Sequence, residues 1–290
     1  MDQFIQLTFT GLTNGAVLAL AALGFVLIYK ASDVINFAQG EFLLIGAYVA
    51  FGVIQQIGLH WTLGVIATLI VAVALGVVLE RLVLRPMIGE PIISLIMVTI
   101  GLASLLRAIV GGIWGTGEFA FPAFIPSHPI QILGATVTTD KLWAIVIAIL
   151  FLGAFSLFFR RSSDGIAMRA VADDQQAALS MGISVKRVFA LAWSIAAMTA
   201  AIGGIIIANI LGVSGNISGI GLRVFPVVIL GGLDSIPGAM VGGIIIGLLE
   251  AYAGGFIGGG LNSVIPFIAL VLILMVRPYG LFGQEIIERV

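Results

Sequence analysis

The sequence has no cysteine and very few charged residues. Only 9% of its 290 residues are Asp, Glu, Lys or Arg, whereas ordinary soluble domains have about 25%. The absence of cysteine excludes disulfides and thiolate chemistry. The formal net charge is −1, so the excess of Lys and Arg that nucleic-acid binding requires is missing. We therefore expect no nucleic-acid partner.

Motifs of enzymes and nucleotide-binding proteins are also missing. There is no HExxH or GxSxG pattern, and the two histidines, His60 and His128, stand alone in expected outer loops. The three lysines, Lys30, Lys141 and Lys186, follow Tyr, Asp and Val, so no Walker-type GxxxxGK motif exists. We expect no enzyme activity, no metal site and no cofactor bound by this chain.

What the sequence has in excess is apolar residues. The hydrophobic content is 60% and the mean hydropathy is +1.22. A membrane-spanning helix needs about 20 apolar residues, so the chain could hold at most about ten spans and no separate globular domain. Continuous apolar runs favour helices over the alternating strands of a β-barrel. Residues 1–290 are therefore expected to form a single transmembrane domain.

Apolar windows with at most one charged residue predict an all-α polytopic membrane protein with about eight transmembrane segments, two of them short or broken. The windows are 6–29, 42–57, 61–79, 91–114, 142–159, a long run at 188–222 that polar residues divide near 212–218, 224–233, 237–252 and 261–276. Residues 115–140 are expected to form a polar outer loop with aromatic residues at the membrane interface. The 38 glycines, for example in GGIIIG at 242–247, predict closely packed helices.

The distribution of Lys and Arg predicts the orientation. If the polar stretch 160–187 is cytoplasmic, most basic residues lie on the same side, as the positive-inside rule requires. These are Lys30, Arg81, Arg85, Arg160, Arg161, Arg169, Lys186, Arg187, Arg277 and Arg289, against Lys141 and Arg223 outside. The N-terminus is then outside and the C-terminus cytoplasmic.

Two hydrophobic segments are interrupted by polar residues, Gly or Pro. The first break, KASDVINFAQGEF, contains Asp33, Asn36, Gln39, Gly40 and Glu41; the second, LGGLDSIPGAMVGG, contains Gly231, Gly232, Asp234, Pro237 and Gly238. Paired breaks of this kind indicate a transport site, since irregular backbone at membrane depth is tolerated where it lines a cavity. The alternative is that both are ordinary short loops whose Asp and Asn residues cap the next helix.

Two charged residues fall inside expected spans. Arg107 is about midway along its span and Glu250 is late in another. Because charge within the bilayer is costly, the two side chains could pair with each other or line a pathway. Alternatively, Arg107 extends its guanidinium toward the interface and Glu250 lies near the outer surface.

The stretch 160–187 contains the pattern of a short capped helix, DDQQAALSMG. Asp173 is the expected N-cap, with Gln176 three residues later in a capping-box arrangement. Asp174 suits the positive end of the helix dipole, and Gly182 is a natural stop. We expect this helix either to pack on its own bundle or to insert into a partner.

Several segments, in order along nearly the whole chain, carry a family resemblance. They are VINFAQGEFLLIGAYVA, ERLVLRP, GIAMRAVADDQQAALSMGISVKRV, ILGGLDSIPGAMVGGIIIGLLEA and RPYGLFG. The chain resembles the LivH-type permease subunits of branched-chain amino acid ABC importers. It departs from the family pattern at Gln39, where His is common, and at Arg107, where neutral polar residues are usual.

The resemblance implies a multi-pass protein of the bacterial inner membrane, working with a second, LivM-type permease, two cytosolic ATPases that bind the ATP, and an extracytoplasmic amino-acid-binding protein. Membrane lipid would surround the chain. The residues implied to line the substrate pathway are Asp33, Asn36, Phe37, Gln39, Gly40, Glu41, Gly231, Gly232, Asp234, Pro237 and Gly238. Those implied to couple to an ATPase are Arg169, Asp173, Asp174, Gln175, Ala178, Met181 and Gly182.

Other functions remain open on sequence grounds. A secondary transporter would also use broken helices and would need buried ionisable groups, for which Asp33, Glu41 and Asp234 are candidates. A passive channel or a membrane scaffold is a further possibility. Within the same family, permeases for urea or short amides are alternatives to one for leucine, isoleucine and valine.

Overall fold

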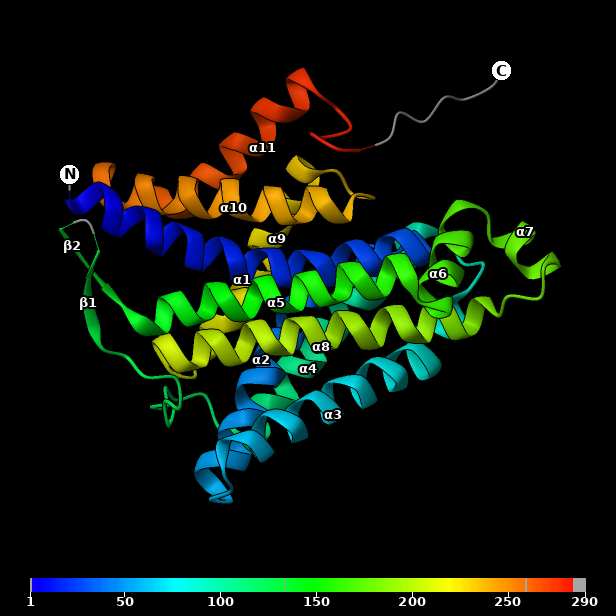
Figure 1. Ribbon diagram of the computed structural model, residues 1–290. Helices are drawn as coiled ribbons and strands as arrows, with labels where there is room; N and C mark the ends of the chain where they lie inside the picture. Colours follow the sequence, from blue (N-terminus) through cyan, green and yellow to red (C-terminus); the bar gives the residue numbers. More distant parts are fainter. Residues whose placement is uncertain (1, 133, 259, 284–290) are drawn as a thin grey trace.

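Two long helices, α1 (Asp2–Ser32) and α8 (Val185–Leu211), form the centre of a helical bundle in the computed structural model (Figure 1). The structure describes residues 2–132, 134–258 and 260–283. In the most apolar window of α1 89% of the residues are buried, and in α8 83%. The outer helices α3 (Trp61–Leu79), α4 (Ile92–Trp114) and α5 (Thr139–Arg161) are mostly exposed and present Leu, Ile and Val side chains. Apolar residues thus cover the outside of the bundle as well as filling its core, which is the pattern of a bundle surrounded by lipid.

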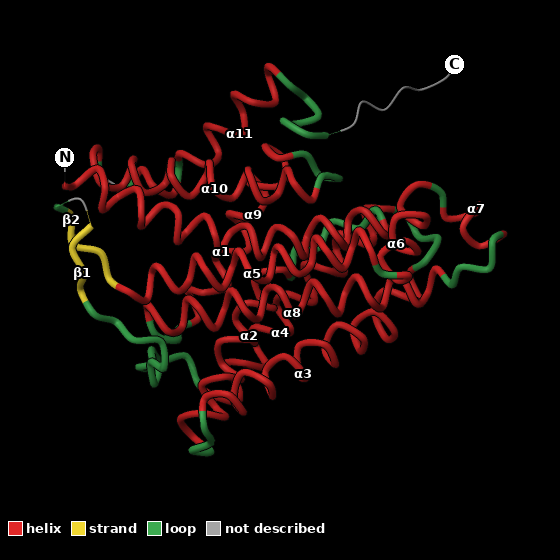
Figure 2. The backbone as a smooth tube through the Cα atoms, in the orientation of Figure 1, coloured by secondary structure: helices red, strands yellow, loops and turns green. Residues whose placement is uncertain are grey.

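The remaining elements complete a largely helical chain (Figure 2). They are α2 (Gln39–Phe51), α6 (Ser163–Asp173), α7 (Gln175–Ser180), α9 (Ile220–Gly231), α10 (Ile236–Tyr252) and α11 (Ile265–Val276), with short π-helical turns at Gly52–Gln56, Glu80–Leu84 and Ala253–Ile257 and 3-10 turns at Arg85–Met87, Gly215–Gly219 and Leu261–Ser263. Within the described residues, six helices are long and apolar enough to cross a membrane, and the segments Gly215–Gly231 and Leu261–Val276 are shorter apolar helices. The prediction of a polytopic helical membrane protein is confirmed.

Part of the expected outer loop is a β-hairpin, which the sequence analysis did not predict. Strands β1 (Pro129–Ile132) and β2 (Ala135–Thr138) pair antiparallel, with Ile130 opposite Val137. Ala135 and Val137, at alternate positions, are each 2% exposed because this face of β2 packs on α1. The alternation has the period of a strand but is too short to be distinctive in the sequence.

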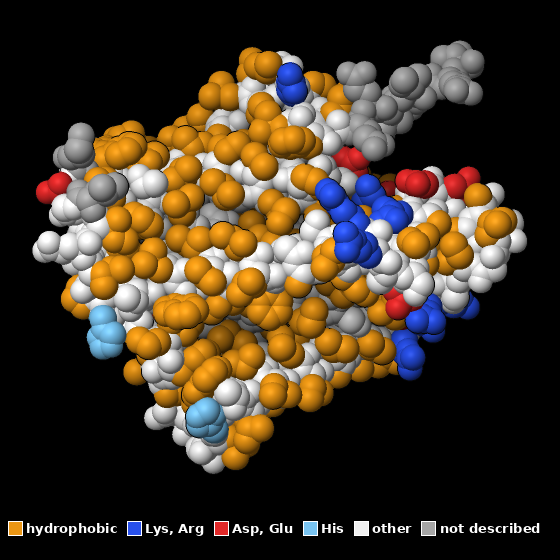
Figure 3. Space-filling model, in the orientation of Figure 1, with side chains coloured by type: hydrophobic (Ala, Val, Ile, Leu, Met, Phe, Trp, Pro, Cys, Tyr) orange, Lys and Arg blue, Asp and Glu red, His pale blue; other side chains and the backbone are white. Residues whose placement is uncertain are grey.

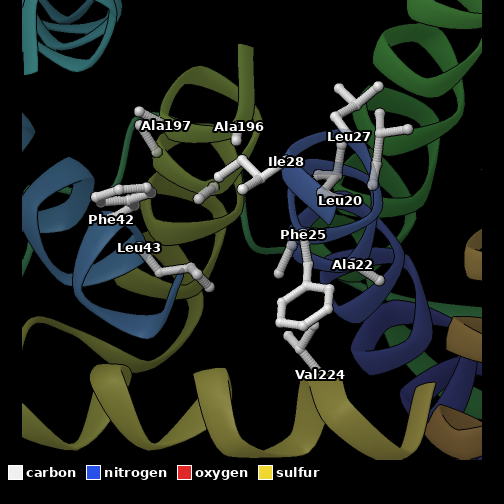
Figure 4. Close-up of a cluster of buried hydrophobic side chains, with 14 of the residues drawn as sticks. Leu20, Ala22, Phe25, Leu27, Ile28, Phe42, Leu43, Ala196, Ala197 and Val224 are labelled. Carbon is white, nitrogen blue, oxygen red and sulfur yellow. The ribbon is translucent and has the colours of Figure 1, made fainter. Parts of the chain in front are cut away.

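Side chains from four helices meet in the core (Figure 4). Phe25 and Ile28 of α1 lie between Phe42 of α2, Ala196 of α8 and Val224 of α9, and all are at most 1% exposed. The small side chain of Ala196 allows the neighbouring helices to come close to α8. This packing fixes where α2 and α9 begin relative to the central helices.

Glycines bring α1 and α10 into backbone contact, as the glycine-rich sequence predicted. A Cβ added to Gly15 would lie 2.8 Å from the carbonyl oxygen of Gly243. A Cβ added to Gly247 would lie 2.5 Å from both the Gly15 Cα and the Gly11 carbonyl oxygen. Without glycine at these crossings the two helices could not adopt their observed separation.

The two ends of the bundle differ in charge. The N-terminal end of α1 and the β-hairpin lie at one end, and α6 and α7 lie at the other (Figure 1). Lys and Arg side chains gather at the α6–α7 end, both histidines lie at the opposite end, and apolar side chains cover much of the surface between them (Figure 3). The C-terminal residues, including Arg289, lie outside the described residues.

Candidate functional site

The first sequence break is a reversal of the chain inside the bundle. Helix α1 ends at Ser32, and Asp33 adopts a left-handed conformation with φ of 55°. The chain then runs back along α1, so that Gln39, the first residue of α2, donates from Nε2 to the carbonyl oxygen of Ala21 at 3.0 Å. Ala21 lies roughly 16 Å from the end of α1, at 1.5 Å per residue. Helix α2 therefore begins at membrane depth, and the prediction of an interrupted helix is confirmed.

Buried side chains hold this reversal in place. Asn36 and Gln39 are each 1% exposed. The Oδ1 atom of Asn36 accepts a hydrogen bond from the Ala38 N–H at 3.0 Å, and its Nδ2 donates to Gln39 Oε1 at 3.2 Å. On the other side, Thr99 of α4 donates to the carbonyl oxygen of Ile35 at 3.2 Å. Asn36 and Thr99 thus pair with backbone groups of the reversal, and Gln39 connects Asn36 to α1.

A second half-helix begins beside the first. Helix α8 ends at Leu211, the 3-10 turn Gly215–Gly219 follows, and α9 starts at Ile220. Helices α2 and α9 meet at two glycines: a Cβ added to Gly40 would lie 3.0 Å from the Gly221 Cα. Polar residues near 212–218 were expected to divide the apolar run 188–222, but these residues were not predicted to lie on the substrate pathway.

A cavity of about 440 Å³ opens where α2, the 3-10 turn, α4 and α9 meet. Its lining is Phe37, Glu41, Ile100, Ala103, Ser104, Arg107, Gly215, Asn216, Ser218, Gly219, Gly221 and Leu222. We call it the central cavity. Phe37 and Glu41 belong to the residues that the sequence placed on the pathway, and Gly40 supports the wall from behind. The sequence had offered Arg107 of α4 as a charge that could line a pathway, whereas the other residues contributed by α4 and those of the 3-10 turn were missed.

An ion pair lies in the wall of the central cavity. Glu41 Oε1 accepts from Arg107 Nε at 3.2 Å and from Arg107 Nη2 at 2.5 Å. The Glu41 side chain is 2% exposed and that of Arg107 61%. Among the described residues, Glu41 Oε2 has no hydrogen-bond partner. The hypothesis that Arg107 pairs with Glu250 is therefore wrong.

Glu250 belongs to a different cavity. Its Oε2 lies 3.5 Å from Arg223 Nη1, and its side chain is 4% exposed. The two residues line a cavity of about 320 Å³, and Lys141 and Asn14 are also part of its lining. Ile220 and Arg223 of α9 face this space, whereas Gly221 and Leu222 face the central cavity. Arg107 and Glu250 thus belong to two separate ion pairs, one on each side of α9.

The second predicted break lies at the α6–α7 end and does not line the central cavity. Helix α9 ends at Gly231 and α10 begins at Ile236, so this break is a short turn between two helices, which was the alternative left open by the sequence. Gly231, Gly232, Asp234, Pro237 and Gly238 form or flank this turn. Its carbonyl groups are used locally, because the Phe282 N–H donates to Gly231 at 3.0 Å and Lys30 Nζ to Asp234 at 3.1 Å.

Two other predicted pathway positions line smaller spaces near the same end. Asp234 and Pro237 line a cavity of about 260 Å³ together with Lys30 and Arg169. Asp33 lines another, of about 270 Å³. The structure therefore does not bring the residues of the two breaks together around one cavity.

Helices α6 and α7 form an arm at the end of α5. The N-cap of α7 is Asp174, whose carboxylate accepts from the N–H groups of Gln176 and Ala177 at 2.8 and 2.9 Å. Asp173 was the expected cap, and that expectation was wrong because α6 continues through Asp173. Gly182 has φ of 82° after the end of α7, as expected for a helix stop.

The arm has an anchored side and a free side. Arg169 donates to the carbonyl oxygen of Phe159, and Gln175 Nε2 to that of Ala31 at 3.4 Å. Ala178 is 3% exposed, whereas Leu179 is 57% and Met181 82% exposed. Figure 1 shows α7 standing clear of the main bundle. The exposed apolar side chains of Leu179 and Met181 therefore lie on the side of the arm that faces away from the bundle.

The fold and the central cavity define a multi-pass membrane permease, in which broken helices surround a polar space between lipid-facing helices. The family described as "Branched-chain amino acid transport system / permease component" matches residues 7–275. The chain belongs to this family, and it is a transport component rather than an enzyme.

Relatives that are similar to this chain over nearly their full length are permease proteins of branched-chain amino acid transport systems. The high-affinity branched-chain amino acid transport system permease protein LivH of Salmonella typhimurium is 34% identical over 99% of this chain and 98% of its own length. LivH of Escherichia coli K12 is 33% identical over the same shares. BraD of Pseudomonas aeruginosa, also a high-affinity branched-chain amino acid permease protein, is 31% identical over 99% of this chain and 98% of its own length.

Proposed function

We propose that this chain forms one half of the membrane pathway of an ATP-driven importer for leucine, isoleucine and valine. It would work with a second, LivM-type permease, two cytosolic ATPases that bind the ATP, and an extracytoplasmic amino-acid-binding protein. The observation that carries the proposal is the central cavity, built from the starts of two half-helices at membrane depth in a chain of this family. The names of the relatives support the substrate class.

The arm supplies the mechanical connection in this proposal. Closure of the ATPases would push α7, because Leu179 and Met181 offer apolar contact at its tip. Gln175 and Ala178 would transmit the movement to α1 and α8, on which α7 rests. The bundle would then switch between outward and inward access, a two-state change biased by nucleotide.

The proposed orientation follows from the charge at the two ends. The basic α6–α7 end is cytoplasmic and the N-terminal end of α1 is outside, in agreement with the positive-inside rule. The C-terminus is then cytoplasmic, and about eight segments cross the bilayer of the bacterial inner membrane. A cytoplasmic arm is what contact with a cytosolic ATPase requires.

Reconstitution tests the proposal against its alternatives. Proteoliposomes that hold the complete complex should accumulate labelled leucine only with internal ATP on the arm side and loaded binding protein on the other side. Vesicles with this chain alone should show no uptake on a proton or sodium gradient. Gradient-driven uptake by the chain alone would establish a secondary transporter instead, and uptake of urea or acetamide in place of leucine would reassign the substrate.

A further inference from the structure

Arg107 presents unused hydrogen-bond donors to the central cavity. A guanidinium carries five N–H groups in one plane. Those of Nε and Nη2 contact a single oxygen of Glu41. Within the part of the chain that the structure describes, Nη1 makes no hydrogen bond, 61% of the side chain is exposed, and Arg107 lines the central cavity.

The charge that faces the cavity is positive. Glu41 is the acidic member of the lining, but its side chain is 2% exposed behind the guanidinium. The other polar side chains of the lining, Ser104, Asn216 and Ser218, are neutral. A ligand that enters the cavity therefore meets a cation whose planar fork matches a carboxylate.

The cavity also has an apolar wall. Ile100 and Ala103 of α4, Leu222 of α9 and Phe37 line it beside Arg107. A molecule with a carboxylate and an aliphatic side chain matches both parts of this lining. Urea and short amides lack the carboxylate.

We propose that Arg107 binds the carboxylate of the transported amino acid and that Glu41 positions the guanidinium for this contact. The proposal rests on the proposed function of the central cavity and deepens it by naming the recognition chemistry. It also assigns a role to an arginine within the membrane, where charge is retained at a cost. Glu41 holds the guanidinium from behind and leaves Nη1 for the substrate.

Uptake by Arg107→Gln in the complete reconstituted complex is the first test. Leucine uptake should fall about tenfold or more, the expected loss for a charge-assisted hydrogen-bonded pair. The rate of ATP hydrolysis stimulated by the loaded binding protein should stay within about twofold of the wild-type rate. The substitution leaves the arm unchanged, and changes at sites far apart act nearly independently. Arg107→Lys should be intermediate, since it keeps the charge but loses the fork.

Arg223→Gln is the matched control. It removes an arginine from a buried glutamate in the other cavity, and it should leave the amount of leucine moved per ATP unchanged. Equal uptake by wild type and Arg107→Gln would overturn the role of Arg107 but not the proposed function. No leucine uptake by the wild-type complex would instead overturn the proposed function.

Ligand binding to the wild-type complex, without the binding protein, provides a test that needs no variant. Leucine and 4-methylpentanoate, which both carry the carboxylate, should raise the thermal unfolding temperature in a concentration-dependent way. Leucinamide, which keeps the ammonium group but lacks the carboxylate, should not. Stabilisation by leucinamide equal to that by leucine would overturn the proposal.

Discussion

Replacing Leu179 and Met181 together by alanine is expected to reduce ATP-driven uptake strongly while the permease still folds and inserts. Both side chains are largely exposed on α7, at 57% and 82%, and α7 stands clear of the main bundle (Figure 1). They contribute little to the bundle's own packing, so their removal should cost the chain little stability. At a protein interface, by contrast, a few buried side chains carry most of the binding energy. We expect uptake to fall at least about tenfold, which corresponds to the loss of about 1.4 kcal/mol at the arm's contact with its partner.

The chain offers a close control for this double variant. Leu272 and Met275 on α11 are 59% and 79% exposed, almost the same as the pair on the arm. Leu272→Ala with Met275→Ala removes similar exposed apolar surface from α11, which is not part of the arm. Uptake and ATP hydrolysis should be measured for both double variants in proteoliposomes. Equal loss for the two, or none for the arm variant, would show that α7 is not the coupling element.

Replacing Gly247 by alanine is expected to reduce the yield of folded protein severely. The added Cβ would lie 2.5 Å from the Gly15 Cα and the Gly11 carbonyl oxygen, which are both backbone and cannot move away as a side chain could. Overpacking of this kind costs about 1–3 kcal/mol or more. That is a large part of the stability of a typical protein, about 5–15 kcal/mol. The thermal unfolding temperature and the monodisperse fraction in detergent should both fall.

Gly153 in α5 provides the comparison for this variant. An added Cβ there meets nothing within 4 Å. Alanine is about 1 kcal/mol more favourable than glycine within a helix, so Gly153→Ala should be neutral or slightly stabilising. A Gly247→Ala protein as stable as Gly153→Ala would contradict the close contact of α1 and α10.

Much of the helical architecture could be predicted from the sequence because the bilayer imposes it. The bilayer core contains no water, so a chain that crosses it must pair its backbone N–H and C=O groups within helices. Long apolar windows in the sequence therefore mark the membrane spans. The break at Asp33–Glu41 was also recognisable, because Asn36 and Gln39 are polar residues in an otherwise apolar run. Their actual role is local: they bond to each other and to the backbone.

The parts that were missed depend on contacts between distant segments. Glu41 and Arg107 are 66 positions apart, and the sequence does not state which helix faces α2. Arg107 was recognised as an unusual charge, but its partner was not. The α9–α10 turn shares the Gly and Asp pattern of the first break and yet lies at the α6–α7 end, since α9 begins rather than ends beside α2. Neighbouring acidic residues, Asp173 and Asp174, both fitted the cap pattern, and only the length of α6 decides between them.

Thiol labelling of the central cavity tests the account most directly. The chain has no cysteine, so single cysteine variants report on one position each. Ser104 lines the cavity, while its neighbour Leu105 is 57% exposed but does not line it. In the reconstituted complex, Ser104→Cys should react with a charged, membrane-impermeant thiol reagent at a rate that changes with nucleotide, and Leu105→Cys should not react. Labelling of Leu105→Cys with Ser104→Cys unreactive in every nucleotide state would contradict a water-filled pathway at this cavity.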